Sequence, residues 1–179
     1  MNEADFFRFC QENKHLHMER DADGIIHAMA PTGFETGKRN SEIVTELSLW
    51  NRIYQLGEVG DSSTGFTLPN GAVRSPDAAW ISHERLNQTT MEDRQRFVHA
   101  VPEFVVEIRS KGDSMKNLRE KMAEYMDNGV LLAWLIDLQN IRVEVYRSGA
   151  ALEATEGFEG KLSGEEVLPE FEFDLKWMR

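Results

Sequence analysis

Apolar residues recur at three- and four-residue spacing in three segments of the chain, which predicts three amphipathic helices. The first covers residues 5–12 and the second residues 40–54, which Gly57 is expected to close in a left-handed conformation. The third ends at Asp127, with Asp113 or Ser114 as its cap and Asn128-Gly129 as its stop. One side of this last helix carries Met115, Leu118, Met122, Tyr125 and Met126.

Runs of β-branched and aromatic residues between turn residues predict the strands. An Asp-Gly turn joins the first two as a hairpin, and the run from Phe104 is apolar enough to form a buried strand. The predicted strands cover residues 16–20, 24–29, 64–68, 72–74, 77–81, 104–108, 130–137, 141–146 and 171–175. This order predicts a single α/β domain over residues 1–179, with a central mixed sheet flanked by helices.

Two acidic residues fall on strands that are expected to be neighbours. Asp77 follows Ser75-Pro76, and Glu107 interrupts the apolar run from Phe104 to Ile108. Such a pair can hold a divalent metal against a phosphodiester. The plainer interpretation is that Asp77 is a strand-entry acid and Glu107 a strand-end acid. Glu107 argues against it, because a carboxylate within a buried strand is costly unless something satisfies it.

Composition and charge limit the class of protein. The 179 residues are 41% hydrophobic and 28% charged, which is typical of a soluble globular protein. No apolar run approaches the roughly 20 residues that span a bilayer, so we expect a cytoplasmic protein with no membrane partner. The formal net charge of −11 disfavours non-specific coating of nucleic acid. The segment from Ile108 to Lys121 nevertheless has five basic and two acidic residues, which allows a locally basic site.

Several short motifs, in order along nearly the whole chain, resemble the Uma-two-type restriction endonucleases of the PD-(D/E)XK nuclease superfamily. The motifs are Asn40-Ser41-Glu42-Ile43, Arg74-Ser75-Pro76-Asp77-Ala78, Val106-Glu107-Ile108-Arg109-Ser110, Leu118-x-x-Lys121-Met122-x-Glu124-Tyr125, Asn128-Gly129 and Trp134-Leu135-Ile136-Asp137. The resemblance implies a restriction-endonuclease-like fold and metal-dependent cleavage of a nucleic-acid backbone. No single motif is specific, but their order is.

The resemblance also implies roles for individual residues. Asp77 and Glu107 match the two acids of the superfamily motif, whereas Arg109 stands where the superfamily has lysine. Related sequences carry that lysine on the following helix, and Lys121 is its counterpart here. Lys121 alone also fits a helix-edge lysine with its head in water. Lys111 is a second basic candidate.

Mg²⁺ prefers oxygen ligands and keeps several waters, and Mn²⁺ can substitute for it. The expected ligands are Asp77, Glu107 and the carbonyl of Ile108, with Glu42 as an additional carboxylate. Arg109 or Lys111 could then hold a phosphate.

The leading prediction is therefore a Mg²⁺-dependent DNA endonuclease. The alternative is a catalytically weak or inactive nuclease-fold module that binds nucleic acid or a protein partner. Arg109 and the overall acidity favour this alternative, while the set of Asp77, Glu107 and Lys121 favours the enzyme. A homodimer would suit cleavage of two strands.

Overall fold

Buried apolar runs form the centre of a six-stranded mixed sheet in the computed structural model, which describes all residues from 1 to 179. The strand order is β10-β9-β8-β7-β6-β3; only β7 and β8 run parallel. These strands are β3 (Gly57–Asp61), β6 (Ala78–Ser82), β7 (Phe104–Arg109), β8 (Leu132–Asp137), β9 (Arg142–Arg147) and β10 (Glu153–Glu156). The predicted mixed α/β architecture is thus confirmed.

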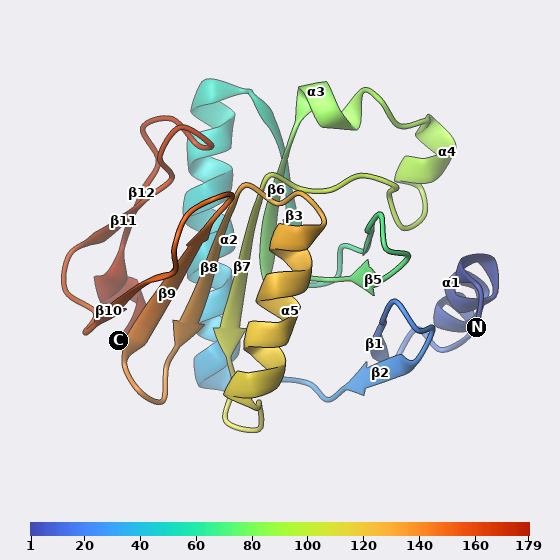
Figure 1. Ribbon diagram of the computed structural model, residues 1–179, viewed down its shortest axis with the longest axis horizontal. Helices are drawn as coiled ribbons and strands as arrows, with labels where there is room; N and C mark the ends of the chain where they lie inside the picture. Colours follow the sequence, from blue (N-terminus) through green and yellow to red (C-terminus); the bar gives the residue numbers. More distant parts are fainter.

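Two long helices cover opposite faces of this sheet: α2 (Phe34–Tyr54) and α5 (Met115–Asp127) (Figure 1). Side chains alternate between the faces along each strand. Val106 of β7 packs in the cluster that includes the α2 residues, whereas Val105 packs in the cluster that includes the α5 residues. Glu107 has the parity of Val105, so it faces α5.

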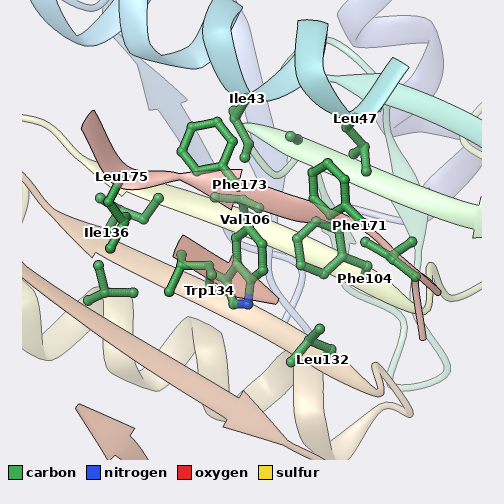
Figure 2. Close-up of a cluster of buried hydrophobic side chains, with 14 of the residues drawn as sticks. Ile43, Leu47, Phe104, Val106, Leu132, Trp134, Ile136, Phe171, Phe173 and Leu175 are labelled. Atoms are coloured by element: carbon green, nitrogen blue, oxygen red, sulfur yellow. The ribbon is translucent and has the colours of Figure 1, made fainter. Parts of the chain in front are cut away.

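Aromatic side chains from the C-terminal segment close the α2 face. This segment contains β11 (Lys161–Ser163), β12 (Glu172–Asp174) and a 3-10 helix, η1 (Leu175–Met178). Phe171 lies nearly parallel to Trp134, with ring centroids 6.0 Å apart, and Phe104 meets Trp134 edge-on at 4.7 Å. Figure 2 shows these rings between the sheet and Ile43 and Leu47 of α2.

A smaller sheet of order β2-β1-β5-β4 lies beside the main one. It contains β1 (His17–Arg20), β2 (Ile26–Met29), β4 (Phe66–Thr67) and β5 (Val73–Arg74), and α1 (Glu3–Glu12) packs on it. Met18 packs with Phe6 and Val73. Because neighbouring strand residues point to opposite faces, Glu19 points away from α1.

The structure differs from the sequence-based expectation at several elements. Helix α2 begins at Phe34, six residues earlier than expected, and Gln55 rather than Gly57 adopts the left-handed conformation, with φ of 53°. Gly57 instead begins β3, where a Cβ would lie 2.1 Å from the carbonyl oxygen of Ile81. Strands β3, β10 and β11 were not expected. The polar segment after Ser82 contains two short helices, α3 (His83–Leu86) and α4 (Met91–Arg94).

The remaining predicted elements are found close to their expected bounds, including the β1–β2 hairpin, β7 and α5. None of the helices has both the length and the apolar composition needed to cross a membrane.

Candidate active site

Asp77 lies directly before β6, at the point where the chain passes close to both α2 and β7. The antiparallel register pairs Ala78 with Val106, so Asp77 falls beside Glu107 and Ile108. Its Oδ2 accepts a 2.7 Å hydrogen bond from the Ile108 amide, and its Oδ1 a 2.6 Å bond from Asn40 Nδ2. Burial raises the pKa of Asp77 above its ordinary value, although these two donors and Lys121 oppose the shift.

The α2 residue that contacts Asp77 is Asn40. Its Oδ1 is buried and has no hydrogen-bond partner, which is costly for an amide oxygen. Glu42, the expected carboxylate on this helix, is half-buried, and its side chain forms no hydrogen bond or ion pair. The Asn-x-Glu motif pointed to the right turn of α2, but sequence reasoning chose the acid in it rather than the amide.

Glu107 is 6% exposed and receives two donors from α5. The Tyr125 hydroxyl donates to its Oε1 at 2.9 Å, and the Lys121 ammonium lies 2.7 Å from the same oxygen. Oε2 receives neither of these bonds. Burial raises the pKa of Glu107 to about 7; the attraction of Lys121 lowers it, while Asp77 and Glu19 add repulsion.

Lys121 and Tyr125 are one turn apart on α5, so both side chains reach the β7 strand from the same side of the helix. The ammonium also lies 2.8 Å from Glu19 Oε1. Burial alone would lower the pKa of Lys121, but the Glu107 and Glu19 carboxylates outweigh it and raise the pKa above its ordinary value. Lys121 therefore remains protonated near neutral pH. In this arrangement it is a charged hydrogen-bond donor rather than a base.

Sequence reasoning missed Glu19, the second carboxylate beside Lys121. It is 3% exposed on β1, and its Oε1 accepts the Ser75 amide at 2.8 Å. Its Oε2 lies 3.1 Å from Arg74, which also pairs with Glu124 of α5 at 2.6 Å. The only sequence signal was an acid next to the apolar Met18 in a short hairpin strand, and that pattern is common on protein surfaces.

Arg109, which stands on β7 where the resemblance leads us to expect lysine, has partners other than Asp77 and Glu107. Its guanidinium pairs with Asp137 of β8 at 2.9 Å and donates to the carbonyl of Asp113 at 3.2 Å. It is therefore already neutralised by a buried acid. Lys111 in the β7–α5 loop is exposed and forms no ion pair. Ile108 contacts Asp77 through its amide, which leaves the expected role of its carbonyl as a prediction.

Most of the basic residues before and within α5 are paired with acidic residues, which the composition of this segment does not indicate. Arg109 pairs with Asp137, Arg119 with Glu144 of β9, and Lys116 with Glu120. Lys121 is held between two carboxylates, so Lys111 is the one basic residue of the five without an ion pair.

The charge around Asp77 and Glu107 suits a divalent cation. Four carboxylates (Asp77, Glu107, Glu19 and Glu124) surround two cations (Lys121 and Arg74), which leaves an excess of two negative charges when all are ionised. No group of three or more His, Cys, Asp or Glu residues is placed to hold a metal. One or two carboxylates plus water, however, are a sufficient set for Mg²⁺. Asp77 and Glu107 therefore fit such an ion.

Comparisons with known proteins identify a family from the sequence and a similar fold among solved structures. The model of the Uma2 family, described as "Putative restriction endonuclease", matches residues 3–176. No match was found among curated proteins. The fold is similar to that in a crystal structure from Anabaena variabilis, described as "a putative nuclease belonging to DUF820". The TM-score is 0.76 at 16% identity, over 90% of this chain and 91% of that one. The chain has a restriction-endonuclease-like fold and belongs to the Uma2 family.

Proposed function

We propose that this protein is a nuclease that hydrolyses phosphodiester bonds in DNA with the help of Mg²⁺. One observation carries the proposal: the carboxylates of Asp77, which is half-buried directly before β6, and Glu107, which is buried on the adjacent β7, lie beside an ammonium that is 2.7 Å from Glu107. The family description and the description of the Anabaena protein both support a nucleic-acid backbone as substrate.

Asp77 and Glu107 would hold the cation, with Mn²⁺ as a substitute. When bound, a divalent cation relieves charge on the phosphoryl oxygens and makes water a better nucleophile. The surplus of negative charge among the site's carboxylates supports this assignment, because buried charges require compensation. Asn40 Oδ1, which is buried without a donor, could accept a hydrogen bond from a water bound near Asp77.

Lys121 would act through its positive charge. A protonated amine beside the scissile phosphate stabilises the negative charge that develops on the phosphoryl oxygens, and it orients the attacking water by donating to it. Helix α5 supplies this amine from a turn that also carries Tyr125. The presence of arginine instead of lysine at position 109 therefore does not deprive the site of a positively charged side chain, because Lys121 of α5 supplies one.

A second candidate function is supported by the pairing of the basic residues. Four of the five lysines and arginines between Arg109 and Lys121 are in ion pairs, and the chain carries a net charge of −11. A nuclease-fold module with weak or no activity, which binds nucleic acid or a protein partner, would have such features.

A homodimer would suit the leading function, because it would present two sites to a duplex.

A cleavage assay tests the proposal. Plasmid DNA, duplex and single-stranded oligonucleotides and RNA are incubated with the purified protein in Mg²⁺, in Mn²⁺ and in chelator. The Asp77→Asn and Glu107→Gln variants are expected to abolish metal-dependent cleavage. Glu144→Gln is the matched control: Glu144 is a buried carboxylate on the same sheet face, 1% exposed, and contacts neither Asp77 nor Glu107.

Three outcomes separate the candidate functions. Loss of cleavage in both site variants but not in the control supports the nuclease. Full cleavage by Asp77→Asn and Glu107→Gln means that the site is elsewhere. A wild-type protein that binds DNA but cleaves no substrate in either metal favours the inactive binding module.

A further inference from the structure

Glu19 is a buried carboxylate that has no role in the proposed hydrolysis. It belongs to the small sheet, yet it contacts α5 through Lys121. Both of its oxygens accept bonds: Oε1 from the Ser75 amide and Lys121, and Oε2 from Arg74. Bonds of this kind are strong because the acceptor is ionised. The Glu19 carboxylate is therefore fixed in one orientation.

Lys121 pairs with two carboxylates, Glu107 and Glu19, which differ in what else they bind. Glu107 is a candidate ligand of the cation, so its carboxylate has to serve both the ammonium and the ion. Glu19 has no such second duty, because a backbone amide and an arginine already take up its remaining capacity. An ammonium held only by Glu107 would depend on what Glu107 binds. An ammonium held also by Glu19 does not.

Arg74 strengthens the second anchor. Its guanidinium bridges Glu19 and Glu124, at 3.1 and 2.6 Å. Glu124 lies one turn after Lys121 on α5, so the helix that carries the lysine is joined to Glu19 both directly and through Arg74. These contacts connect β1 to the turn of α5 that carries Lys121.

We propose that Glu19 is a positioning residue that keeps the Lys121 ammonium at the site independently of Glu107. The assignment deepens the proposed function and rests on it for the role of Lys121 in hydrolysis. The position of the lysine itself can be tested without any cleavage, so the two ideas can fail separately.

The test measures the reactivity of the Lys121 amine. The full-length protein is labelled by reductive methylation at native pH, with and without Mg²⁺, and methylation at each lysine is quantified by mass spectrometry. Lys111 and Lys116, which are exposed, serve as internal standards for reagent and time. We expect Lys121 of the wild type to be labelled much more slowly than these standards, in both conditions. A rise in Lys121 labelling when Mg²⁺ is added to the wild type would overturn the proposal.

Variants then identify the anchor. In Glu19→Gln, Lys121 labelling is expected to rise several-fold over the wild type, and to rise further with Mg²⁺. Glu144→Gln is expected to label like the wild type, because its carboxylate contacts Arg119, Arg142 and Tyr146 but not Lys121. Glu19→Asp keeps the charge and is expected to restore part of the protection. If Lys121 is labelled equally in Glu19→Gln and in the wild type, with and without Mg²⁺, Glu19 does not position the lysine. If Lys121 labelling in Glu19→Gln rises by the same factor with and without Mg²⁺, Glu19 does not hold the lysine independently of Glu107.

Cleavage kinetics give a further readout. Glu19→Gln is expected to lower kcat by about ten- to hundredfold, as the loss of an outer partner in a metal site typically does, and to leave KM unchanged. If the wild type cleaves nothing, the nuclease proposal fails while the labelling experiment still decides the role of Glu19. If Glu19→Gln does not fold, the Mg²⁺ arm on the wild type and the Glu19→Asp variant still decide it.

Discussion

The Lys121 ammonium lies 2.7 Å from Glu107 Oε1, although the two residues are 14 positions apart in the sequence. The sequence resemblance leads us to expect a lysine two positions after this acid on the same strand, and Arg109 stands there. Arg109 is positively charged but pairs with Asp137, whereas helix α5 brings the Lys121 amine to the strand that carries Glu107 and so supplies a positive charge beside this carboxylate. A residue that lies outside the expected sequence position, Lys121, therefore provides the amine at the site.

Replacing Lys121 tests whether the charged amine itself is required. Lys121→Met retains the length and the apolar stem of the side chain but removes the charged donor, and we expect cleavage to fall by about 10²- to 10³-fold. Lys121→Arg is expected not to restore it, because a planar guanidinium cannot occupy the space of a compact ammonium between two carboxylates. Single-turnover kinetics in Mg²⁺ measure both effects. Equal rates for wild type and Lys121→Met would remove Lys121 from the mechanism.

The amide of Asn40 predicts a separate effect on cation affinity. Asn40→Ala removes a 2.6 Å hydrogen bond that orients the Asp77 carboxylate. We expect Mg²⁺ binding, measured by calorimetry without nucleic acid, to weaken by about ten- to hundredfold. Glu42→Gln changes a residue two positions along the same helix whose side chain makes no bond, and it should leave the affinity unchanged. A stronger effect of Glu42→Gln than of Asn40→Ala would reinstate Glu42 as the ligand on α2.

Much of the architecture could be predicted from the sequence because its signals are local. The apolar run Phe104–Ile108 and the stripe of α5 define elements that the structure contains, and the turn before Gly24 marks the hairpin. Strand β3 could not be predicted, since Gly57–Asp61 lacks alternating apolar residues and is held as a strand by pairing with β6. The start of α2 at Phe34 was missed for a similar reason: Gly33 and Gly37 are poor helix residues.

The site was harder to predict than the fold. Asp77, Glu107 and Lys121 could be selected because they belong to motifs with a characteristic order. Glu19 and Asn40 act through contacts across 102 and 37 positions of the sequence, and the local patterns around them, an acid beside Met18 and an Asn-x-Glu motif, do not reveal those contacts. Long-range ion pairs also explain why the free basic segment expected before α5 is largely neutralised by Asp137 and Glu144.

Arg109 and Lys111 are expected to respond differently to alanine. Arg109→Ala leaves the Asp137 carboxylate, which is 1% exposed, without its cation, and should lower the free energy of unfolding by about 2–3 kcal/mol. Lys111→Ala removes an exposed side chain and should change stability by less than about 0.5 kcal/mol. If Lys111 contacts a phosphate, its loss weakens DNA binding and lowers the salt slope by about one. Urea unfolding and binding titrations at several salt concentrations measure these effects.

An opposite pattern would be informative. A stable Arg109→Ala variant with weakened DNA binding would mean that the pair with Asp137 opens to release the guanidinium to a phosphate. An unchanged salt slope in Lys111→Ala would place the nucleic acid away from the β7–α5 loop.

The raised pKa of Glu107 predicts that the cation-free protein loses stability as the pH rises. Its pKa is about 7 in the folded protein and near 4.5 in an unfolded chain, so between these values the folded state holds a proton that the unfolded state releases. Stability from this group is complete below pH 4.5 and is lost as the pH rises to about 7, by on the order of 3 kcal/mol. The raised pKa of Asp77 acts in the same direction. The pKa of Glu19 is lowered, so this group stabilises the fold above its unfolded pKa of 4.5, and that stabilisation is lost only as the pH falls below this value.

Urea unfolding in chelator at pH 5 and pH 8 measures this loss, and Glu107→Gln should reduce it. Histidines also titrate in this window, so the comparison with the variant isolates the carboxylate. Glu144→Gln should keep the wild-type loss, because the pKa of Glu144 is lowered and the group is ionised at both pH values. Mg²⁺ binds the ionised carboxylates, and it should restore stability at pH 8 more than at pH 5 in the wild type. Equal pH dependence in wild type and Glu107→Gln would mean that Glu107 is ionised throughout this range and that Lys121 alone compensates its burial.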